Sequence, residues 1–548
     1  MPAETVDALV VGAGHNGLVA ANRLADAGWD VLVLEATSTP GGAVSSAELT
    51  APGFRSDRCS AFYPLGAASP VLRGLRLEEY GLRWRHAPAV LAHLLPDGRA
   101  AVLHRDPART AESVEQFAAG DGQRWLAAYQ EWQGLSRQIL AGLFGPVPPV
   151  RAAAGLLRRL GPGGALRLGR RWLLPVRRLG GELFGGEGAR ALLAGCALHT
   201  DLTLEQAGGG GYGWLLAMLA QEYGFPVPDG GAQRLTDALV ARLHAKGGRI
   251  AYQQPVDRVA VAGGRALGAR TAGGQWYRAR RAVVADVPAP VLYRELVGSS
   301  RLPPALLSDL DRFEWDSATV KVDWALAGPV PWRSPEVAGA GTVHLGGDLN
   351  DLGRYAAALA RDEVPFEPFL VLGQMTTTDP SRSPAGTESV WAYTHLPHRP
   401  EWSKAELARH VARVEQLLEW HAPGFGALVR GRHVAGPADL AAENPSLVGG
   451  ALGGGTAALH QQLVLRPVPG LGRADTPIDR LYLASSSAHP GPGVHGGPGG
   501  NAARAALARD RAVTGGLYAA AVAAAHRAIY PPDRWEPPPD SPPDPPAG

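Results

Sequence analysis

A glycine-rich turn between an apolar strand and a helix, close to the N-terminus, constrains the fold of this chain more than any other feature. The run Ala8–Val11 predicts a strand, and Gly12-Ala-Gly14-His-Asn-Gly17 follows it at once. Residues 18–27 have the apolar spacing of a helix, and residues 31–34 predict a second strand that ends at Glu35. This order of strand, turn, helix, strand and acid predicts a dinucleotide-binding unit of the Rossmann type.

Each residue type in this unit has a physical reason for its place. Gly12 permits the tight turn, Gly14 lets the backbone approach a diphosphate, and Gly17 lets helix and sheet pack closely. The start of the helix offers backbone N–H groups and the positive end of a dipole to phosphates. Glu35 is expected to accept hydrogen bonds from ribose hydroxyls. His15 lies inside the turn, where we expect it to pack or to form a local hydrogen bond instead of acting as a catalytic residue.

A second match to the same spacing, Gly208-Gly-Gly210-Gly-Tyr-Gly213, lacks this context. No clear strand precedes it and no strand ending in an acid follows it, in a chain that contains 71 glycines. We therefore predict a flexible or close-packed turn there instead of a phosphate site.

Length, charge and cysteine content exclude several classes of protein. A chain of 548 residues is expected to form two domains, and a net charge of +2 argues against nucleic-acid binding. Its two cysteines, Cys59 and Cys196, support neither a disulfide framework nor a cysteine-rich metal site. The N-terminal residues do not resemble a signal peptide, and we find no run of about 20 apolar residues. These features predict a cytoplasmic protein without a membrane span.

The segment after the second strand makes the prediction more specific. Pro40-Gly41-Gly42-Ala43 contains a glycine pair that would let another backbone segment reach the same cofactor. The run from Val10 through Gly42 resembles the FAD-binding start of the phytoene-desaturase-like and amine-oxidase-like flavoproteins. Many members carry arginine after the glycine pair, whereas this chain has Ala43, so no charged side chain is expected to reach the flavin from that position.

A glycine-dense loop near the C-terminus carries the same resemblance. Residues 481–484 predict a strand, the loop 485–500 follows, and residues 501–508 predict a helix. The order resembles the C-terminal FAD motif of the phytoene-desaturase-like family, which we prefer to a surface loop. Backbone N–H groups near Val494, His495 and Gly496 are then expected to bond the pyrimidine edge of the flavin.

Segments between the two motifs extend the resemblance over about residues 5–515. Val256 stands where relatives use a backbone contact to adenine. Asp379-Pro with Pro384-Ala-Gly386, and Arg466-Pro with Thr476-Pro477, match a branch that includes animal proteins named for a pyridine nucleotide-disulfide oxidoreductase domain. The resemblance implies FAD contacts at Gly12, Gly14, His15, Asn16, Gly17, Glu35, Ala36, Gly41, Gly42, Ala43, Val256, Ser485, Gly493, Val494, His495, Gly496 and Asn501.

The predicted fold is α/β, with a discontinuous, glutathione-reductase-like Rossmann domain for FAD and a second α+β domain for the substrate. We expect the FAD domain to comprise 1–85, 228–290 and 475–520, and the substrate domain to comprise 86–227 and 291–474. A Pro-rich tail, 531–548, is expected to be disordered.

Residues 136–195 alternate apolar residues with many arginines, among them Arg151, Arg158, Arg159 and Arg167. Such a surface can lie on an anionic membrane and admit a lipophilic substrate. An ordinary solvated helix face is the alternative, and the sequence leaves both open.

The resemblance implies that a substrate delivers hydride to flavin N5, with oxygen, a quinone or another molecule as the final electron acceptor. No proton-accepting residue can be identified, and His489 and His495 are weak candidates. His199, Asp201, His344 and His395 fall in the substrate domain without the spacing of a metal site.

Three functions follow from these expectations. The leading one is a dehydrogenase or desaturase that acts on a mostly apolar small molecule. An amine oxidase is the main alternative, and a low-turnover, flavin-bearing partner-binding protein is a second; no residue excludes a non-redox isomerase that uses reduced flavin.

Overall fold

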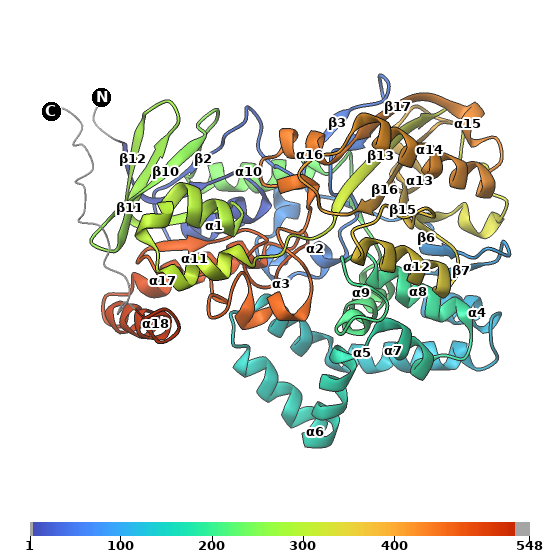
Figure 1. Cartoon of the computed structure of the whole chain (residues 1–548), viewed down its shortest axis with the longest axis horizontal. Coiled ribbons are helices and arrows are strands. Elements are labelled where there is room, and N and C mark those ends of the chain that lie inside the picture. The colour runs from blue at the N-terminus through green and yellow to red at the C-terminus, as the bar shows by residue number, and fades with distance from the viewer. Residues whose placement is uncertain (1–3, 532–548) are drawn as a thin grey trace.

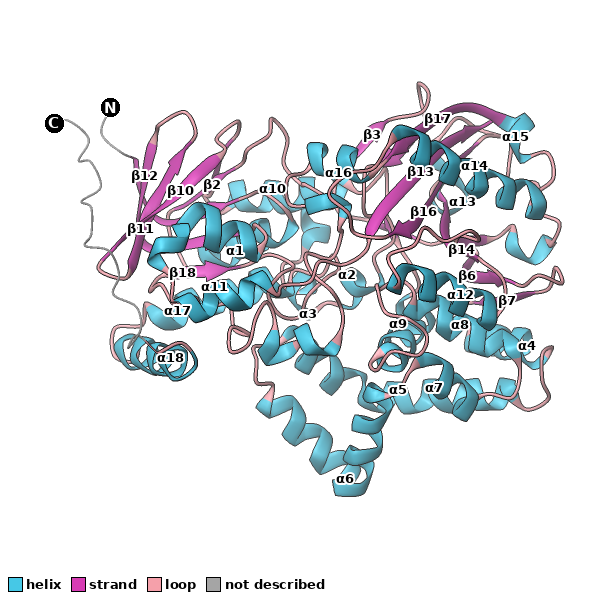
Figure 2. Cartoon of the chain, in the orientation of Figure 1, coloured by secondary structure: helices cyan, strands magenta, loops and turns pink. Residues whose placement is uncertain are grey.

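The computed structural model describes residues 4–531, in which the strands gather mainly into two sheets at opposite ends of the molecule (Figures 1 and 2). Apart from Pro531, the predicted Pro-rich tail lies outside the described residues. Helices pack on both sheets, and a large helical region lies beneath the second sheet in Figure 1.

The first sheet has seven strands in the order β10-β11-β12-β1-β2-β9, with β18 paired to the far end of β12. Strands β18, β12, β1, β2 and β9 are parallel, and β10, β11 and β12 form an antiparallel meander. The bounds are β1 Glu4–Val11, β2 Val31–Leu34, β9 Arg249–Ala251, β10 Val256–Ala262, β11 Arg265–Thr271, β12 Trp276–Ala285 and β18 Leu481–Leu483. Three distant parts of the chain therefore build one sheet.

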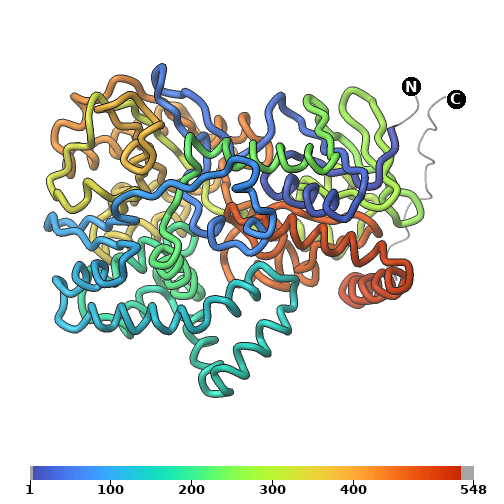
Figure 3. The backbone as a smooth tube through the Cα atoms, turned by 180° about the vertical axis from the view of Figure 1, so that it is seen from behind, coloured from blue at the N-terminus to red at the C-terminus, as the bar shows by residue number. Residues whose placement is uncertain are grey.

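The apolar runs of the sequence form the centre of this sheet. The second half of β1 and all of β2 are buried, as expected of parallel strands that are covered on both faces. Helices α1 (His15–Asp26), α10 (Gln233–Ala245) and α17 (Gly497–Arg509) pack side by side on one face. Seen from behind, the N-terminal and C-terminal segments lie next to each other (Figure 3).

Two helices start earlier than their apolar spacing predicts. Helix α1 begins at His15 instead of residue 18, and α17 begins at Gly497 instead of residue 501. In both cases the first helical turn contains glycines, which the sequence pattern assigns to a loop. Glycine is needed there for contact: a methyl carbon at Gly499 would lie 2.0 Å from the carbonyl oxygen of Asn16.

The second sheet has seven strands in the order β17-β13-β16-β15-β14-β6-β7, all antiparallel except the pair β14 and β6. The bounds are β6 Ala89–Leu94, β7 Ala100–Leu103, β13 Ala318–Leu326, β14 Ala340–Leu345, β15 Leu370–Gln374, β16 Glu388–Leu396 and β17 Val429–Ala435. Two short pairs complete the strands: β3 Ser46–Glu48 with β4 Arg55–Asp57, and β5 Trp84–Arg85 with β8 Val227–Pro228.

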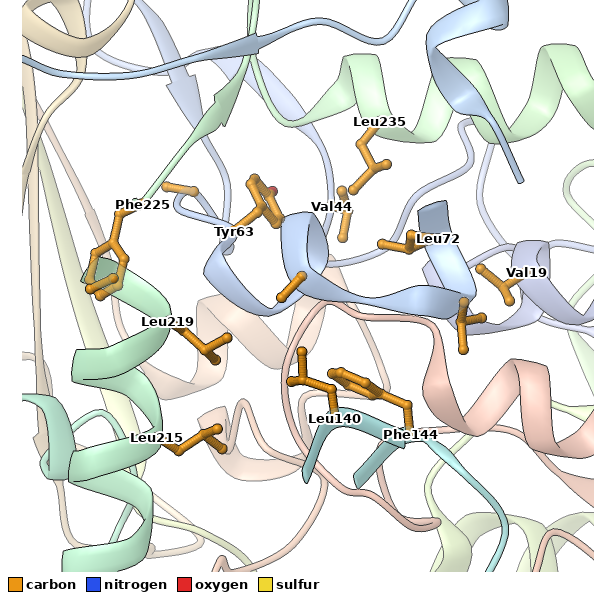
Figure 4. Packing of buried hydrophobic residues seen from close by; sticks show 14 of the residues in the cluster. Val19, Val44, Tyr63, Leu72, Leu140, Phe144, Leu215, Leu219, Phe225 and Leu235 are labelled. Atoms are coloured by element: carbon orange, nitrogen blue, oxygen red, sulfur yellow. The ribbon is translucent and has the colours of Figure 1, made fainter. Parts of the chain in front are cut away.

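The remaining helices connect and cover the sheets. Their bounds are α2 Pro64–Ala68, α3 Pro70–Arg73, α4 Pro107–Glu115, α5 Asp121–Phe144, α6 Val150–Leu173, α7 Val176–Leu183, α8 Glu187–Ala197, α9 Gly209–Tyr223, α11 Pro304–Asp311, α12 Leu349–Ala360, α13 Met375–Thr378, α14 Lys404–His421, α15 Phe425–Leu428, α16 Pro437–Glu443 and α18 Gly515–Ile529. One continuous core joins the first sheet to the helical region: Leu140 and Phe144 of α5 belong to the same buried cluster as Tyr63, Leu72 and Val19 of α1 (Figure 4).

The second glycine motif forms the start of a helix, so the predicted turn is wrong. Helix α9 begins at Gly209 and continues through the motif. Its glycines serve close packing, since a methyl carbon at Gly213 would lie 2.6 Å from the carbonyl oxygen of Leu193. Apolar spacing was hidden there because the packed face of the helix is made of glycine.

Among residues 4–531, no helix has both the length and the apolar character that a bilayer crossing requires. Helix α6 projects from the body of the molecule (Figure 1). It bends at Gly161, which has φ +65°, just before Pro162.

A buried ion pair connects the β3–β4 pair with the loop that follows β15. Arg382 and Asp57 are both fully buried and paired, with Arg382 Nη1 at 3.2 Å from Asp57 Oδ1. The same carboxylate accepts hydrogen bonds from Ser46 Oγ at 2.7 Å and from the Ala232 N–H at 2.8 Å. Asp379, whose motif marked the branch, accepts from the Gly230 N–H at 2.8 Å.

We predict that Arg382→Met lowers the free energy of unfolding by about 3 kcal/mol or more, because it leaves the Asp57 carboxylate buried without its cation. Arg354→Met is the matched control. Arg354 pairs with Asp351 on the surface, where removal of an ion pair costs less than about 1 kcal/mol. Denaturant midpoints followed by circular dichroism measure both, and equal losses would contradict the prediction.

Candidate functional site

A cavity of about 880 Å³ runs from the glycine-rich turn after β1 to the face of the second sheet. Its volume is within the range of small-molecule and cofactor pockets. At one end its lining includes the turn, the end of β2 and the start of β10; at the other end it includes residues of β13, β14, β15 and β16.

The glycine-rich turn is shaped by contacts closer than any side chain allows. Gly12 has φ +94°, which favours glycine. A methyl carbon at Gly17 would lie 2.2 Å from the carbonyl oxygen of Gly12, and one at Gly14 would lie 2.6 Å from Asp286 Oδ2. None of these three positions can therefore take a side chain without movement of its neighbours.

The start of α1 presents unpaired polar groups. The backbone N–H groups of His15 and Asn16 have no acceptor among the described residues, as expected for a first helical turn. His15 Nε2 and Asn16 Oδ1 are also buried without a partner in that part of the chain. Unpaired buried groups of this kind fit a polar ligand at the helix start.

The glycine pair after β2 packs beside the glycine-rich turn. Gly41 forms an isolated bridge with Gly14, and its N–H donates to the carbonyl of Ala13 at 2.9 Å. Gly42 and Ala43 then line the cavity.

Glu35 lies at the end of β2, at the cavity wall with Ala36. Its Oε2 accepts from the Ala13 N–H at 2.8 Å, and its Oε1 accepts from the Thr37 N–H at 2.9 Å. The carboxylate is thereby held in a fixed position, facing the same cavity as Val256 at the start of β10. This geometry suits a residue that orients a ribose.

The C-terminal loop is only partly brought to the cavity. Ser485, Gly493 and Val494 line it. Gly496 is the N-terminal cap of α17 and packs toward Val19, and Asn501 bonds Gly145 and Arg504 inside the helical layer. Neither Gly496 nor Asn501 is in the cavity lining. Gly17 is not in the lining either, and it packs against the carbonyl group of Gly12 within the turn.

The two histidines considered for proton transfer lie outside the cavity lining. His495 Nδ1 accepts from the Gly497 N–H at 3.0 Å, and its Nε2 lies 3.2 Å from the carbonyl of Pro492. His489 borders a separate small pocket beside Arg473 and Tyr518. We therefore set both aside as catalytic candidates: His495 holds the loop in shape.

The opposite wall of the cavity is one face of the second sheet. Thr319 and Lys321 on β13, and Trp391, Tyr393 and His395 on β16, all line it, because alternate residues of a strand point to the same side. The rings of Trp391 and Tyr393 stack with centroids 5.9 Å apart and an interplanar angle of 14°. The wall therefore offers a mainly aromatic surface with one cation.

That cation, Lys321, was missed by the sequence reasoning. Its Nζ lies 2.5 Å from both carboxylate oxygens of Asp323, and both side chains are almost completely buried. The Asp323 carboxylate neutralises an ammonium that would otherwise be costly to bury. A lysine and an aspartate two residues apart in an otherwise apolar strand are the signal that marks this pair in the sequence.

The carboxylates of Asp201 and Asp316 lie near the glycine-rich segment 453–455 and repel each other. Asp316 accepts from the N–H groups of Gly453 at 2.7 Å and Gly455 at 3.1 Å, and Asp201 accepts from the Ala457 N–H at 2.8 Å. Burial, reinforced by repulsion from Asp201, raises the pKa of Asp316 to about 6. Both side chains line the cavity.

Histidine His199 also lines the cavity and contacts a second histidine. Its Nε2 lies 2.8 Å from Nε2 of His344. Burial lowers the pKa of His199 to about 4, so the ring is neutral at pH 7. Among the described residues, no group of three or more histidine, cysteine, aspartate or glutamate side chains is arranged to hold a metal ion.

Arg466 fixes the loop that carries these groups. It is completely buried, and it donates to the carbonyl of Ser486 at 2.7 Å, of Thr456 at 2.8 Å and of Gly453 at 3.1 Å. Asp316 binds the N–H groups of the same loop. Arg466 therefore ties the loop 453–456 to the C-terminal glycine-dense loop, and both line the cavity.

Comparison with known proteins supports the dinucleotide site that the geometry indicates. Residues 17–497 match the family model described as flavin containing amine oxidoreductase. The chain belongs to this family.

Two curated relatives align over most of both chains. The chain is 30% identical to pyridine nucleotide-disulfide oxidoreductase domain-containing protein 2 of Rattus norvegicus, over 91% of this chain and 92% of that protein. It is 27% identical to hydroxyneurosporene desaturase of Cereibacter sphaeroides, over 89% and 94%. The structure of wild-type putrescine oxidase bound to putrescine has the same fold, with a TM-score of 0.58 and 17% identity over 92% of this chain and 99% of that chain.

These findings confirm three expectations: the resemblance to phytoene-desaturase-like flavoproteins, FAD as the cofactor, and an FAD-dependent oxidoreductase as the enzyme class. They show the fold as that of amine-oxidase-type oxidoreductases with mixed α/β sheets. The residues present fit the cofactor, because the cavity combines a diphosphate-type turn, unpaired N–H groups at a helix start and a fixed acid for a ribose.

We predict that Gly17→Ala reduces FAD content at least about tenfold, because the added methyl group displaces the carbonyl of Gly12 and opens the turn. Gly181→Ala in α7 is the control, since a methyl group there meets no atom within 4 Å. The flavin absorbance per protein of the purified variants measures the effect. Full FAD content in Gly17→Ala would show that the turn does not hold the cofactor.

Proposed function

We propose that FAD lies along this cavity with its adenosine near Glu35 and Val256, its diphosphate at the start of α1, and its flavin toward Gly493, Val494 and the face of the second sheet. The support is the placement of predicted contacts: thirteen of the seventeen residues named from the sequence line a single cavity, all but Gly17, His495, Gly496 and Asn501.

We also propose the finer fold class and the domain division expected from the sequence. A five-stranded parallel sheet with an attached antiparallel meander supports a glutathione-reductase-like Rossmann domain. Its strands come from within 1–85, 228–290 and 475–520, and those of the second sheet from within 86–227 and 291–474. The second set supports a separate substrate domain.

We propose that the enzyme dehydrogenates a mostly apolar small molecule. The observation that carries this is the aromatic wall. Trp391 stacks with Tyr393, Phe62 lies against Trp391 with ring centroids 6.0 Å apart, and these three rings and Phe225 all line the cavity. FAD supplies the two-electron acceptor. The chain's own groups bind the substrate against these rings and exclude water, and a proton lost with the hydride can pass to His199 or to a carboxylate.

An amine substrate is the second candidate, and a specific observation favours it. The carboxylates of Asp201 and Asp316 line the cavity, and among the described residues neither forms an ion pair with an arginine or lysine; the buried guanidinium of Arg466 interacts electrostatically with both. A substrate ammonium group would balance the negative charge of these two carboxylates. Hydroxyneurosporene desaturase and putrescine oxidase represent the two substrate types among the compared proteins.

A cavity that continues beyond the proposed flavin position argues against a purely partner-binding role. For reoxidation we propose oxygen or a quinone. Of the Gly-x-Gly-x-x-Gly matches at Gly12–Gly17 and Gly208–Gly213, only the first follows a strand, and the second forms the start of helix α9 instead of a second dinucleotide site.

Anaerobic bleaching of the flavin by candidate substrates discriminates the two classes. If the substrate is an amine, Asp201→Asn should raise its KM at least about tenfold, because the substituted amide keeps the Ala457 N–H bond but loses the charge. With an apolar substrate the same variant should behave like the wild type. Asp97→Asn, at an exposed acid, is the control. A panel of isoprenoids, lipids and amines that causes no bleaching would contradict both.

We further propose peripheral membrane contact through α6. Four of its apolar side chains are exposed, namely Val150 at 66%, Leu157 at 49%, Leu166 at 75% and Leu173 at 60%. The bend at Gly161 divides α6 into two halves. Val150 and Leu157 lie on one side of the first half, and Leu166 and Leu173 lie on one side of the second, because residues seven apart face the same way on a helix. Arg151, Arg158, Arg159 and Arg167 have no acidic partner among the described residues. Apolar side chains beside unpaired cations suit an anionic lipid surface.

We predict that the protein sediments with vesicles containing phosphatidylglycerol. The triple variant Leu157→Ser/Leu166→Ser/Leu173→Ser should lower this binding at least about fivefold, because it removes apolar area that enters the lipid on binding. Phe366→Ser, which removes a side chain 75% exposed elsewhere, should have no effect. Added salt should weaken wild-type binding. Equal binding by the triple variant would assign α6 to an ordinary solvated surface.

A further inference from the structure

A carboxyl group lies at the start of α1, beside the position proposed for the diphosphate. Asp286 follows the end of β12, and its Oδ2 accepts the Gly17 N–H at 2.7 Å. The same oxygen lies 2.6 Å from the point where a methyl carbon of Gly14 would be. Of the N–H groups in the first turn of α1, that of Gly17 is therefore bound by a side chain from another strand, while those of His15 and Asn16 remain available for a ligand.

The surroundings of Asp286 disfavour its charge. Burial raises its pKa to about 7, against the hydrogen bond from Gly17, and repulsion from Glu35 acts in the same direction as burial. No lysine or arginine of the described residues forms an ion pair with it. The other oxygen, Oδ1, receives no hydrogen bond from those residues, and the carboxyl group lines the cavity.

A diphosphate at this helix start brings two further negative charges to a place that already holds Glu35 and Asp286. Like charges at such short range strongly favour the neutral form of the group that is most easily protonated. A protonated carboxyl group has one O–H donor and keeps an acceptor oxygen. It can therefore retain the Gly17 N–H at Oδ2 and donate from Oδ1 to a phosphate oxygen.

We propose that Asp286 is protonated when FAD is bound and donates its O–H to the diphosphate, so that binding of the cofactor takes up one proton. The proton comes from solvent and no bond other than the O–H is formed or broken. This inference rests on the proposed position of FAD and assigns Asp286 as a residue that couples cofactor binding to pH.

The other titratable groups around the turn do not produce the same effect near neutral pH. Burial lowers the pKa of His15, on α1, to about 4, and that of His495, on the C-terminal loop, to about 3, so both stay neutral. Glu35, from β2, faces Asp286 but accepts hydrogen bonds at both oxygens. Asp316 binds the N–H groups of Gly453 and Gly455, and it is not among the groups that shift the pKa of Asp286.

The test is the Kd of FAD for the full chain, freed of cofactor, from about pH 6 to about pH 9, followed by quenching of flavin fluorescence. For the wild type we expect a constant Kd at low pH and then a rise of up to about tenfold per pH unit above the pKa of Asp286 in the free protein. Asp286→Asn, which keeps an acceptor for Gly17 and supplies a permanent donor, should bind with a pH-independent Kd and more tightly than the wild type at high pH.

Titration calorimetry in two buffers of different ionisation enthalpy counts the protons directly, and it does not depend on the folding of a variant. Near pH 8 the wild type should take up close to one proton per FAD, and Asp286→Asn close to none. A pH-independent wild-type Kd without proton uptake, or the same pH dependence in Asp286→Asn, would overturn the proposal while leaving the FAD site intact. Absence of FAD binding by both proteins at every pH would overturn the cofactor site itself.

Discussion

The first turn of α1 is packed from three directions, and the rest of the structure is arranged around that packing. Gly17 lies against the carbonyl of Gly12 on its own segment, Gly499 brings the start of α17 against Asn16, and Asp286 reaches in from β12. Each contact leaves no room for a β-carbon. Because the three segments are far apart in sequence, the packed turn requires the end of β12 and the start of α17 to lie against the start of α1. The dinucleotide site is thus a consequence of the tertiary packing of these three segments.

A second set of contacts connects this turn to the chemistry. Arg466 holds the loop 453–456 by its carbonyl groups, and Asp316 holds it by its N–H groups. The same guanidinium binds Ser486 beside the C-terminal glycine-dense loop. These bonds connect the loop 453–456, the residue that precedes β13 by two positions, and the loop that follows β18. The buried guanidinium of Arg466 is tolerated because its Nε, Nη1 and Nη2 atoms all donate to carbonyl groups.

Local sequence was sufficient where function is carried by the backbone. The turn at Gly12, the acid at Glu35 and the glycine pair at Gly41 are signalled by spacing and composition, and the structure brings them to one cavity. Sequence was insufficient where function depends on long-range packing. His495 and Asn501 stand in the correct loop and helix, yet their side chains satisfy neighbouring groups instead of facing the cavity. Which way a side chain turns is decided by its tertiary neighbours, and a glycine-dense segment contains few of the apolar positions that would reveal them.

The acids of the cavity make its electrostatics the feature that decides what it can hold. Glu35 and Asp286 lie beside the glycine-rich turn, at the proposed cofactor end, and Asp201 and Asp316 lie beside segment 453–457, at the proposed substrate end. Lys321 and Arg58 are paired with Asp323 and Glu443. Because Arg58 and Lys321 are already paired with acids, the cavity stabilises an added anion mainly through backbone N–H groups and protonation, and it stabilises an added cation through its carboxylates. The two ends therefore impose opposite demands on pH: the diphosphate end favours protonated carboxyl groups, and an ammonium substrate would favour ionised ones. An apolar substrate removes the second demand, so the pH dependence of substrate binding separates the two substrate classes independently of turnover.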